Sequence, residues 1–153
     1  MTEEMINDYS RRIVQSSCVG LTVITLDIAK EYITEALNSE DESFIDGVRN
    51  ARRCMDTLTS GLDVNVSISR DLLILYLYMK KVLSEQLSKR DDDKLEAVLR
   101  MIVKLKTSFS QVESEDSSGP VMKNVQKVYA GLTYGPGSLN ETCDNSTNRG
   151  YLA

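Results

Sequence analysis

Proline and glycine are distributed so unevenly in this chain that they restrict its fold more than any other feature. Both prolines, Pro120 and Pro136, and five of the eight glycines lie after residue 110. The first 110 residues therefore hold no proline and only three glycines. Residues that break helices, or that shape the turns between short strands, are nearly absent there. The sequence predicts a body of long helices over residues 1–110 and a separate tail over residues 111–153.

Two segments of the body repeat apolar residues at the spacing of a one-sided helix. The first repeat uses steps of 4, 3, 4, 3 and 4 residues over Phe44, Val48, Ala51, Met55, Leu58 and Leu62. The second repeat uses steps of 3, 4, 3 and 4 residues over Leu95, Val98, Ile102, Leu105 and Phe109. Such steps keep side chains on one stripe of a helix. Each segment is therefore predicted to form a helix with one buried face, the second behind an acidic cap at residues 91–93.

Two further helices, predicted over residues 17–38 and 69–88, carry apolar residues on more than one face. In the first, the clearly polar positions fill only about a third of the helix circumference. In the second, the predicted core face consists of Leu72, Leu75, Tyr76, Met79, Val82 and Leu83. Four further apolar residues of that helix point away from this face, and they are Leu73, Ile74, Leu77 and Tyr78. One buried face does not account for the apolar residues of either helix.

Short polar joints separate the four predicted helices, at residues 38–41, 64–69 and 89–92. Joints of this length connect neighbouring antiparallel helices. The predicted fold is all-α, an antiparallel up-and-down four-helix bundle with a C-terminal tail. In the tail, between a linker and a flexible end, a short extra amphipathic helix is predicted from the helical spacing of Val121, Val125, Val128 and Leu132.

The composition argues against most catalytic and nucleic-acid-binding functions. The chain has no histidine, so it lacks the usual general base, the Ser-His-Asp and Cys-His arrangements and imidazole metal ligands. Its 18 basic and 23 acidic residues give a net charge of -5, which disfavours a protein that neutralises nucleic-acid phosphates. We therefore expect neither an enzyme nor a cofactor or metal ion, and we expect no nucleic-acid partner.

Signals for secretion and membrane insertion are not evident in the sequence. The three cysteines are odd in number and form no CxxC pair, a pattern typical of a reducing compartment. The first fifteen residues are charged and do not resemble the apolar core of a signal peptide. The longest apolar run covers residues 72–79, whereas roughly 20 residues are needed to cross a bilayer. We expect a cytoplasmic protein with no membrane insertion.

The surplus apolar face of the 69–88 helix allows three interpretations. The helix lies centrally in the bundle, or the protein dimerises through it, or the face belongs to an apolar groove that receives a segment of another chain. Tyr76 and Tyr78 favour the groove, because tyrosine is enriched at binding surfaces. The residues alone leave these interpretations open, and they leave the oligomeric state open as well.

Two short motifs around the second and third predicted helices are similar to those of one family. The motifs LTSGLD at residues 58–63 and LYLYM at residues 75–79 resemble those of the flagellin export chaperone family, FliS. Near the N-terminus, Tyr9 and the DIA sequence at residues 27–29 continue the resemblance. The similarity covers roughly residues 5–110, and the LYLYM cluster is its most specific part.

The resemblance implies a cytoplasmic four-helix chaperone that binds the disordered C-terminal segment of flagellin. Such a chaperone prevents flagellin from polymerising before it reaches the flagellar export apparatus, which is a further expected partner. The resemblance also implies that the segment around Tyr9 packs over the groove. The predicted partner-binding residues are Tyr9, Leu21, Ile24, Ile28, Leu73, Ile74, Leu77 and Tyr78. The alternative is a self-associating helical scaffold or regulatory protein with no exported client.

Overall fold

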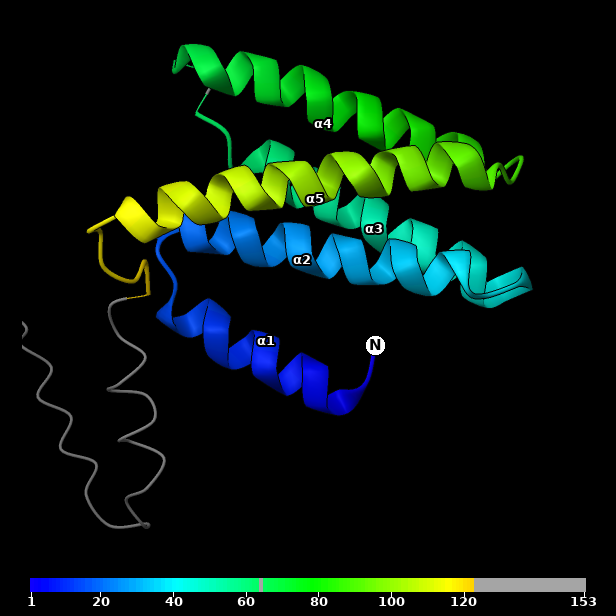
Figure 1. Cartoon of the computed structure of the whole chain (residues 1–153), viewed down its shortest axis with the longest axis horizontal. Coiled ribbons are helices and arrows are strands. Elements are labelled where there is room, and N and C mark those ends of the chain that lie inside the picture. Colours follow the sequence, from blue (N-terminus) through cyan, green and yellow to red (C-terminus); the bar gives the residue numbers. More distant parts are fainter. Residues whose placement is uncertain (64, 123–153) are drawn as a thin grey trace, which may run out of the picture. The chain divides into compact units, whose positions relative to one another are not determined.

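The computed structural model describes residues 1–63 and 65–122, and these residues form five helices and no strand. The helices are α1 (Glu3–Gln15), α2 (Cys18–Leu37), α3 (Asp41–Ser60), α4 (Ser67–Gln86) and α5 (Asp92–Glu115) (Figure 1). The predicted all-α class is confirmed, and α1 is an additional helix at the N-terminus. The last helix continues past residue 110. The short tail helix expected from residue 121 onward lies almost entirely outside the described residues.

Side-chain caps explain where two of the helices begin. The Ser17 Oγ accepts a hydrogen bond from the Gly20 N–H at 3.2 Å, at the start of α2. The Asp91 Oδ1 accepts a hydrogen bond from the Lys94 N–H at 3.2 Å, at the start of α5. Each bond satisfies an N–H group that has no partner within the first helical turn. The acidic cap expected ahead of the last helix is therefore confirmed at Asp91.

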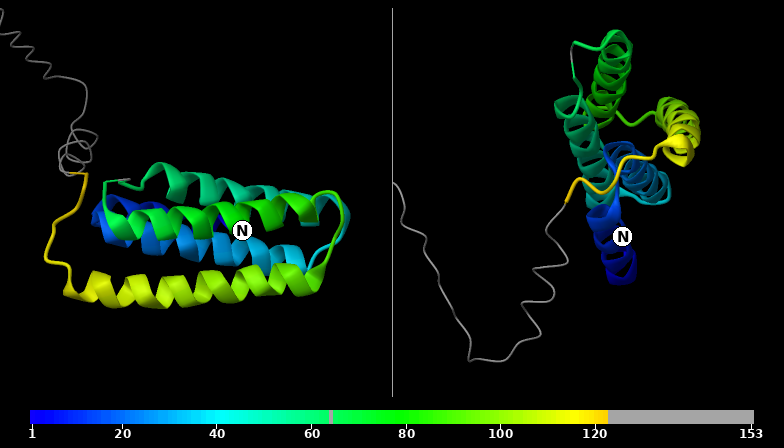
Figure 2. Two further views of the ribbon diagram at one scale, coloured as in Figure 1. Left: turned by 90° about the horizontal axis from the view of Figure 1, so that it is seen from above. Right: turned by 90° about the vertical axis from the view of Figure 1, so that its left-hand side faces the viewer.

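Helices α2–α5 pack around one core, and each contacts its neighbours in turn. Helix α2 packs against α3 and α5, α3 packs against α4, and α4 packs against α5. Helix α1 packs against α2, on the side of α2 that faces away from α4 (Figures 1 and 2). Helix α1 is therefore a separate layer outside the four long helices.

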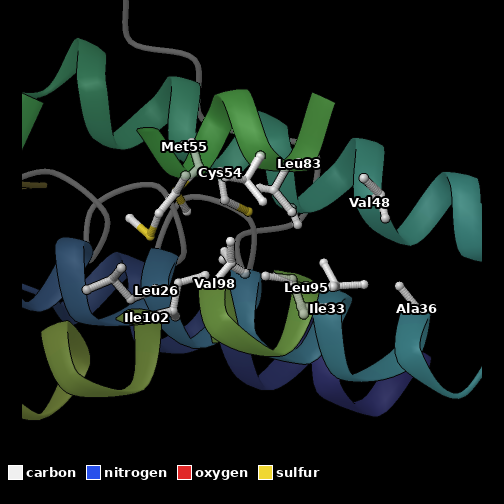
Figure 3. Close-up of a cluster of buried hydrophobic side chains, with 14 of the residues drawn as sticks. Leu26, Ile33, Ala36, Val48, Cys54, Met55, Leu83, Leu95, Val98 and Ile102 are labelled. Carbon is white, nitrogen blue, oxygen red and sulfur yellow. The ribbon is translucent and has the colours of Figure 1, made fainter. Parts of the chain in front are cut away.

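The core is built from apolar side chains of all four long helices (Figure 3). The side chains with no exposed surface include Leu26, Ile33, Val48, Met55, Met79, Leu83, Leu95 and Ile102. Full burial of a large apolar side chain stabilises a fold by about 1.5–3 kcal/mol. The apolar faces predicted from the sequence thus pack against one another and hold the four helices together.

All six residues of the core face expected on the third long helix lie in the core or pack against it, but they are fully buried only toward its C-terminal end. The buried apolar residues of α4 are Tyr76, Met79, Val82 and Leu83. In contrast, Leu72 and Leu75 are only partly buried, and Ile68, one turn before Leu72, is 63% exposed. The N-terminal half of α4 is therefore covered less completely by its neighbours, and it leaves apolar surface open that the sequence assigns to the core.

Gly47 allows α3 to approach α2 closely. A Cβ atom at this position would lie 2.9 Å from the Ala36 Cβ and 2.9 Å from the Tyr32 carbonyl oxygen. Because the second of these atoms belongs to the backbone of α2, a side chain at position 47 would push the two helices apart. The absence of a side chain at position 47 therefore lets α2 and α3 pack closely.

Arg90 links two joints at one end of the molecule. Its guanidinium group donates to the Ser39 carbonyl oxygen at 2.9 Å and to the Asp92 carboxylate at 2.7 Å. It also lies 4.5 Å from the centroid of the Phe44 ring, which is a cation–π contact. The α2–α3 joint and the α4–α5 joint are therefore held together by one side chain.

Candidate partner-binding surfaces

The structure divides the eight predicted partner-binding residues between two surfaces. The α4 face is the set on α4, consisting of Leu73, Ile74, Leu77 and Tyr78. We call the other four the α1–α2 interface, because Tyr9 lies on α1 and Leu21, Ile24 and Ile28 lie on α2, against which α1 packs. Because α1 lies on the side of α2 that faces away from α4, these surfaces do not form one groove (Figure 1).

The N-terminal segment forms α1, which packs on α2, the helix that carries Leu21, Ile24 and Ile28 of the predicted partner-binding set, and not on the α4 face. That it acts as a lid over a client groove stays a prediction. One contact that holds α1 there is the hydrogen bond that the Tyr9 hydroxyl donates to the Asp27 carboxylate on α2 at 3.3 Å. The α4 face therefore stays open while α1 is docked.

Three large apolar side chains of the α4 face are open to solvent. Ile74 is 68% exposed, Tyr78 is 54% exposed and Leu77 is 48% exposed, whereas Leu73 is half-buried. Residues three and four positions apart are neighbours on a helix surface, so the three exposed side chains form one patch. Contiguous apolar patches of this kind mark surfaces that bind other proteins.

The α4 face continues into a groove between α4 and α5. The groove has a volume of about 220 Å³. Its apolar lining consists of Tyr78, Val82, Ala97, Val98 and Met101, and its charged lining consists of Lys81, Glu85 and Lys94. Tyr78 belongs to both the α4 face and the groove, so the two form one apolar surface flanked by charges of both signs. Such a surface fits an amphipathic segment of another chain.

Few apolar side chains are available to hold α1 on α2. Tyr9, Val23 and Ile24 are buried, but none of them belongs to the core cluster of α2–α5. Leu21 and Ile28 are partly buried, and Ile28 packs against that core cluster. Tyr9 is the one buried residue that α1 contributes. The attachment of α1 therefore depends on few apolar contacts.

Polar contacts at Asp27 supplement these apolar ones. Besides the Tyr9 hydroxyl, the Asp27 carboxylate contacts the Arg12 guanidinium at 3.5 Å and the Lys30 ammonium at 3.6 Å. It also pairs with the Lys106 ammonium of α5. Asp27 thus joins α1, α2 and α5, and we call these five residues the Asp27 hub. One feature of the sequence indicates this hub, which is the acidic Asp27 between the apolar residues Leu26 and Ile28 of the predicted 17–38 helix.

The charges of the Asp27 hub fix the protonation states of its members. Burial raises the pKa of Asp27, but the hydrogen bond and charge of Lys106 and the charge of Lys30 outweigh it and hold that pKa below its ordinary value of 3.8. Burial and the neighbouring Asp27 carboxylate raise the pKa of Tyr9 to about 12. At neutral pH, Asp27 is therefore ionised and the Tyr9 hydroxyl keeps the proton that it donates.

A second hollow, of about 520 Å³, lies between α2 and α5. It is lined by Lys30, Val103, Lys106, Thr107, Ser110, Gln111 and Ser114. Both lysines are already paired with carboxylates, Lys106 with Asp27 and Lys30 with Glu31. The hollow therefore presents no uncompensated charge that would select an ionic ligand.

Metal-binding clusters are absent from the part of the chain that the structure describes. There, no group of three or more histidine, cysteine, aspartate or glutamate side chains is placed to hold a metal ion. None of the five described helices is long and apolar enough to cross a membrane. The α4 face with its groove and the α1–α2 interface are therefore the two candidate partner-binding surfaces.

Comparison with known proteins identifies the family. No curated protein matches the chain. A family model described as flagellar protein FliS matches residues 6–116. The chain belongs to the FliS family. The resemblance to the flagellin export chaperones is therefore confirmed, and the matched region includes all eight predicted partner-binding residues of this FliS protein.

Replacing Asp27 with asparagine should loosen α1 in this FliS protein. The change removes the charge that attracts Arg12 and Lys106, and a hydrogen bond to a charged group is stronger than one to a neutral group. We expect backbone amides of α1 to exchange with solvent at least about threefold faster at neutral pH, with α3 unchanged. Hydrogen exchange measured by mass spectrometry reports both regions.

The Asp27 hub also makes the docking of α1 on α2 depend on pH. Because the folded-state pKa of Asp27 is depressed, its contribution to α1 docking is present above the ordinary value of 3.8 and is lost as the pH falls through the folded value. As the pH falls through this range, the NMR signal of the Tyr9 amide should move toward its position in the spectrum of Asp27→Asn.

Asp46→Asn is the matched control for Asp27→Asn, because Asp46 pairs with Arg49 on the surface. Equal loosening of α1 in both variants would contradict the role of the hub.

Proposed function

We propose that this FliS protein binds the C-terminal segment of flagellin and prevents its premature polymerisation before flagellar export. The observation that carries the proposal is the α4 face, where large apolar side chains remain open to solvent beside the α4–α5 groove. A chaperone needs such a surface, because its client is disordered and offers apolar side chains that have no core of their own.

The energetics of the α4 face are consistent with a disordered client. Fully burying a large apolar side chain contributes about 1.5–3 kcal/mol, and the exposed residues of the α4 face would lose most of their remaining contact with water. A client that becomes ordered on binding loses about 2–5 kcal/mol or more. Several apolar contacts therefore have to act together, and the outcome is binding that is specific yet reversible.

The α1–α2 interface is the second contact region in this proposal. Ile24 lies on α2, against which α1 packs, and it is buried, so a client reaches it only after the packing around it moves. Because α1 makes few apolar contacts, such a movement requires little free energy. We propose that Tyr9, Leu21, Ile24 and Ile28 contact the client when α1 re-packs.

We interpret helices α2–α5 as the antiparallel four-helix bundle predicted from the sequence. The interpretation is supported by their order of contacts, in which α2 meets α3, α3 meets α4, α4 meets α5 and α5 meets α2. We place the chaperone in the cytoplasm, where flagellin is synthesised, and propose that it delivers its client to the flagellar export apparatus. Binding and release require no enzymatic activity.

Self-association through the α4 face is the second candidate function. The same exposed apolar side chains fit a second copy of the chain as well as they fit a client. In that case the protein is a helical scaffold or regulator with no exported client. The two functions differ in whether a flagellin peptide binds to the α4 face.

Light scattering after size-exclusion chromatography separates the two functions. The purified chain is measured with and without a peptide from the C-terminal segment of the flagellin of the same organism. We expect the peptide to add its mass to the 17.1 kDa chain, one peptide per chain. A stable dimer whose mass does not change with peptide would support the scaffold and contradict the chaperone.

A further inference from the structure

The joint between α1 and α2 contains only two residues. Helix α1 ends at Gln15 and α2 begins at Cys18, so Ser16 and Ser17 alone connect them. Both have extended backbone, with φ and ψ of -90° and 146° at Ser16 and of -69° and 174° at Ser17. An extended joint of this kind does not by itself fix the angle between two helices. Contacts from elsewhere therefore determine how α1 lies on α2.

The chain that follows α5 returns to this joint. We call residues 116–122 the strap. The Asp116 N–H donates to the Glu113 carbonyl oxygen at 3.1 Å, and the Ser118 N–H donates to the Asp116 carboxylate at 2.9 Å, which turns the chain back. The Val121 N–H then donates to the Ser16 carbonyl oxygen at 3.1 Å. Figure 2 shows the strap crossing from the end of α5 toward the α1–α2 joint.

Two further groups lie near the joint. Hydrogen bonds from Ser118 hold the pKa of Asp116 below its usual value, and the Ser17 side chain acts in the same direction. On α5, the Glu113 carboxylate lies so close to α2 that a Cβ atom at Gly20 would be 2.6 Å from its Oε1. The end of α5 therefore lies beside the first turn of α2, directly after the joint.

We infer that the strap is a clamp on the α1–α2 joint, which sets how readily α1 lifts from α2. The clamp acts on the backbone of the joint, at a place where α1 has few apolar contacts of its own. The inference concerns the free protein and does not depend on the identity of the client.

Substituting Val121 with proline in the full chain removes the central bond of the clamp. Proline has no N–H, and the Val121 side chain is exposed, so little else is lost. We expect amide exchange across α1 to become about three- to tenfold faster, the range that corresponds to one lost hydrogen bond. Exchange in α3 and α4 should stay unchanged, because the core of α2–α5 is untouched.

Met122→Pro is the matched control. It introduces the same ring one residue later, at an exposed position whose N–H bonds to no described residue. We expect its α1 exchange rates to equal those of the unmodified chain. Unchanged α1 exchange in Val121→Pro would overturn the inference. Equal acceleration by both prolines, or acceleration that extends to α3 and α4, would overturn it as well.

Discussion

Replacing Leu83 with aspartate is expected to abolish the cooperative unfolding of this FliS protein. Leu83 has no exposed surface and packs in the core shared by α2–α5 (Figure 3). Removing a buried leucine costs about 2–5 kcal/mol, and burying a carboxyl group without a partner costs several kcal/mol more. That sum is comparable with the total stability of a small domain, about 5–15 kcal/mol. Circular dichroism during heating should show no sharp transition.

The matched control is Leu77→Asp, the same change on the same helix. Leu77 is 48% exposed, and exposed substitutions usually change stability by only about 0.5 kcal/mol. An aspartate at position 77 also precedes Lys81 by four residues, which is a favourable spacing for an ion pair on a helix. Leu77→Asp should therefore melt nearly as the unmodified chain does. If both variants melted alike, the α4 face would be part of the core.

The four long helices could be predicted from the sequence because their signals are local. Apolar steps of three and four residues and the Asp91 cap act within one or two turns. The partial burial of Leu72 and Leu75 could not be predicted in the same way. Helical periodicity gives the direction of a side chain, whereas burial depends on whether another helix covers that direction, and this is a property of the whole fold.

The candidate site likewise has one part that could be predicted from the sequence and one part that could not. Ile74, Leu77 and Tyr78 could be recognised because they are too apolar for a helix with only one buried face. The Asp27 hub could not be assembled from the sequence, because Lys106 is 79 residues away from Asp27. The contacts of Tyr9 and Arg12 with Asp27 belong to that hub, so they could not be predicted either.

Binding of the client should depend strongly on the α4 face. In the proposed function, Leu77 lies in the middle of the exposed patch, between Ile74 and Tyr78 in the sequence. Leu77→Asp would replace an apolar contact worth about 1.5–3 kcal/mol with a carboxylate that loses its water on binding. Since about 1.4 kcal/mol corresponds to a factor of ten in affinity, we expect the dissociation constant to rise at least tenfold.

Val103→Asp provides the matched control for this binding experiment. Val103 is 43% exposed, close to the value for Leu77, but it lines the hollow between α2 and α5 and is not part of the α4 face. The two variants therefore introduce the same charge at equally exposed apolar positions. They differ in whether the position belongs to the proposed client surface.

The most direct measurement is the dissociation constant of the flagellin C-terminal peptide for the unmodified chain, Leu77→Asp and Val103→Asp, by isothermal titration calorimetry. Both variants are first shown to melt like the unmodified chain. The account predicts binding to the unmodified chain and to Val103→Asp within about threefold of each other, and binding at least tenfold weaker to Leu77→Asp. Equal affinities for all three chains, or no binding to the unmodified chain, would contradict the α4 face as the client site.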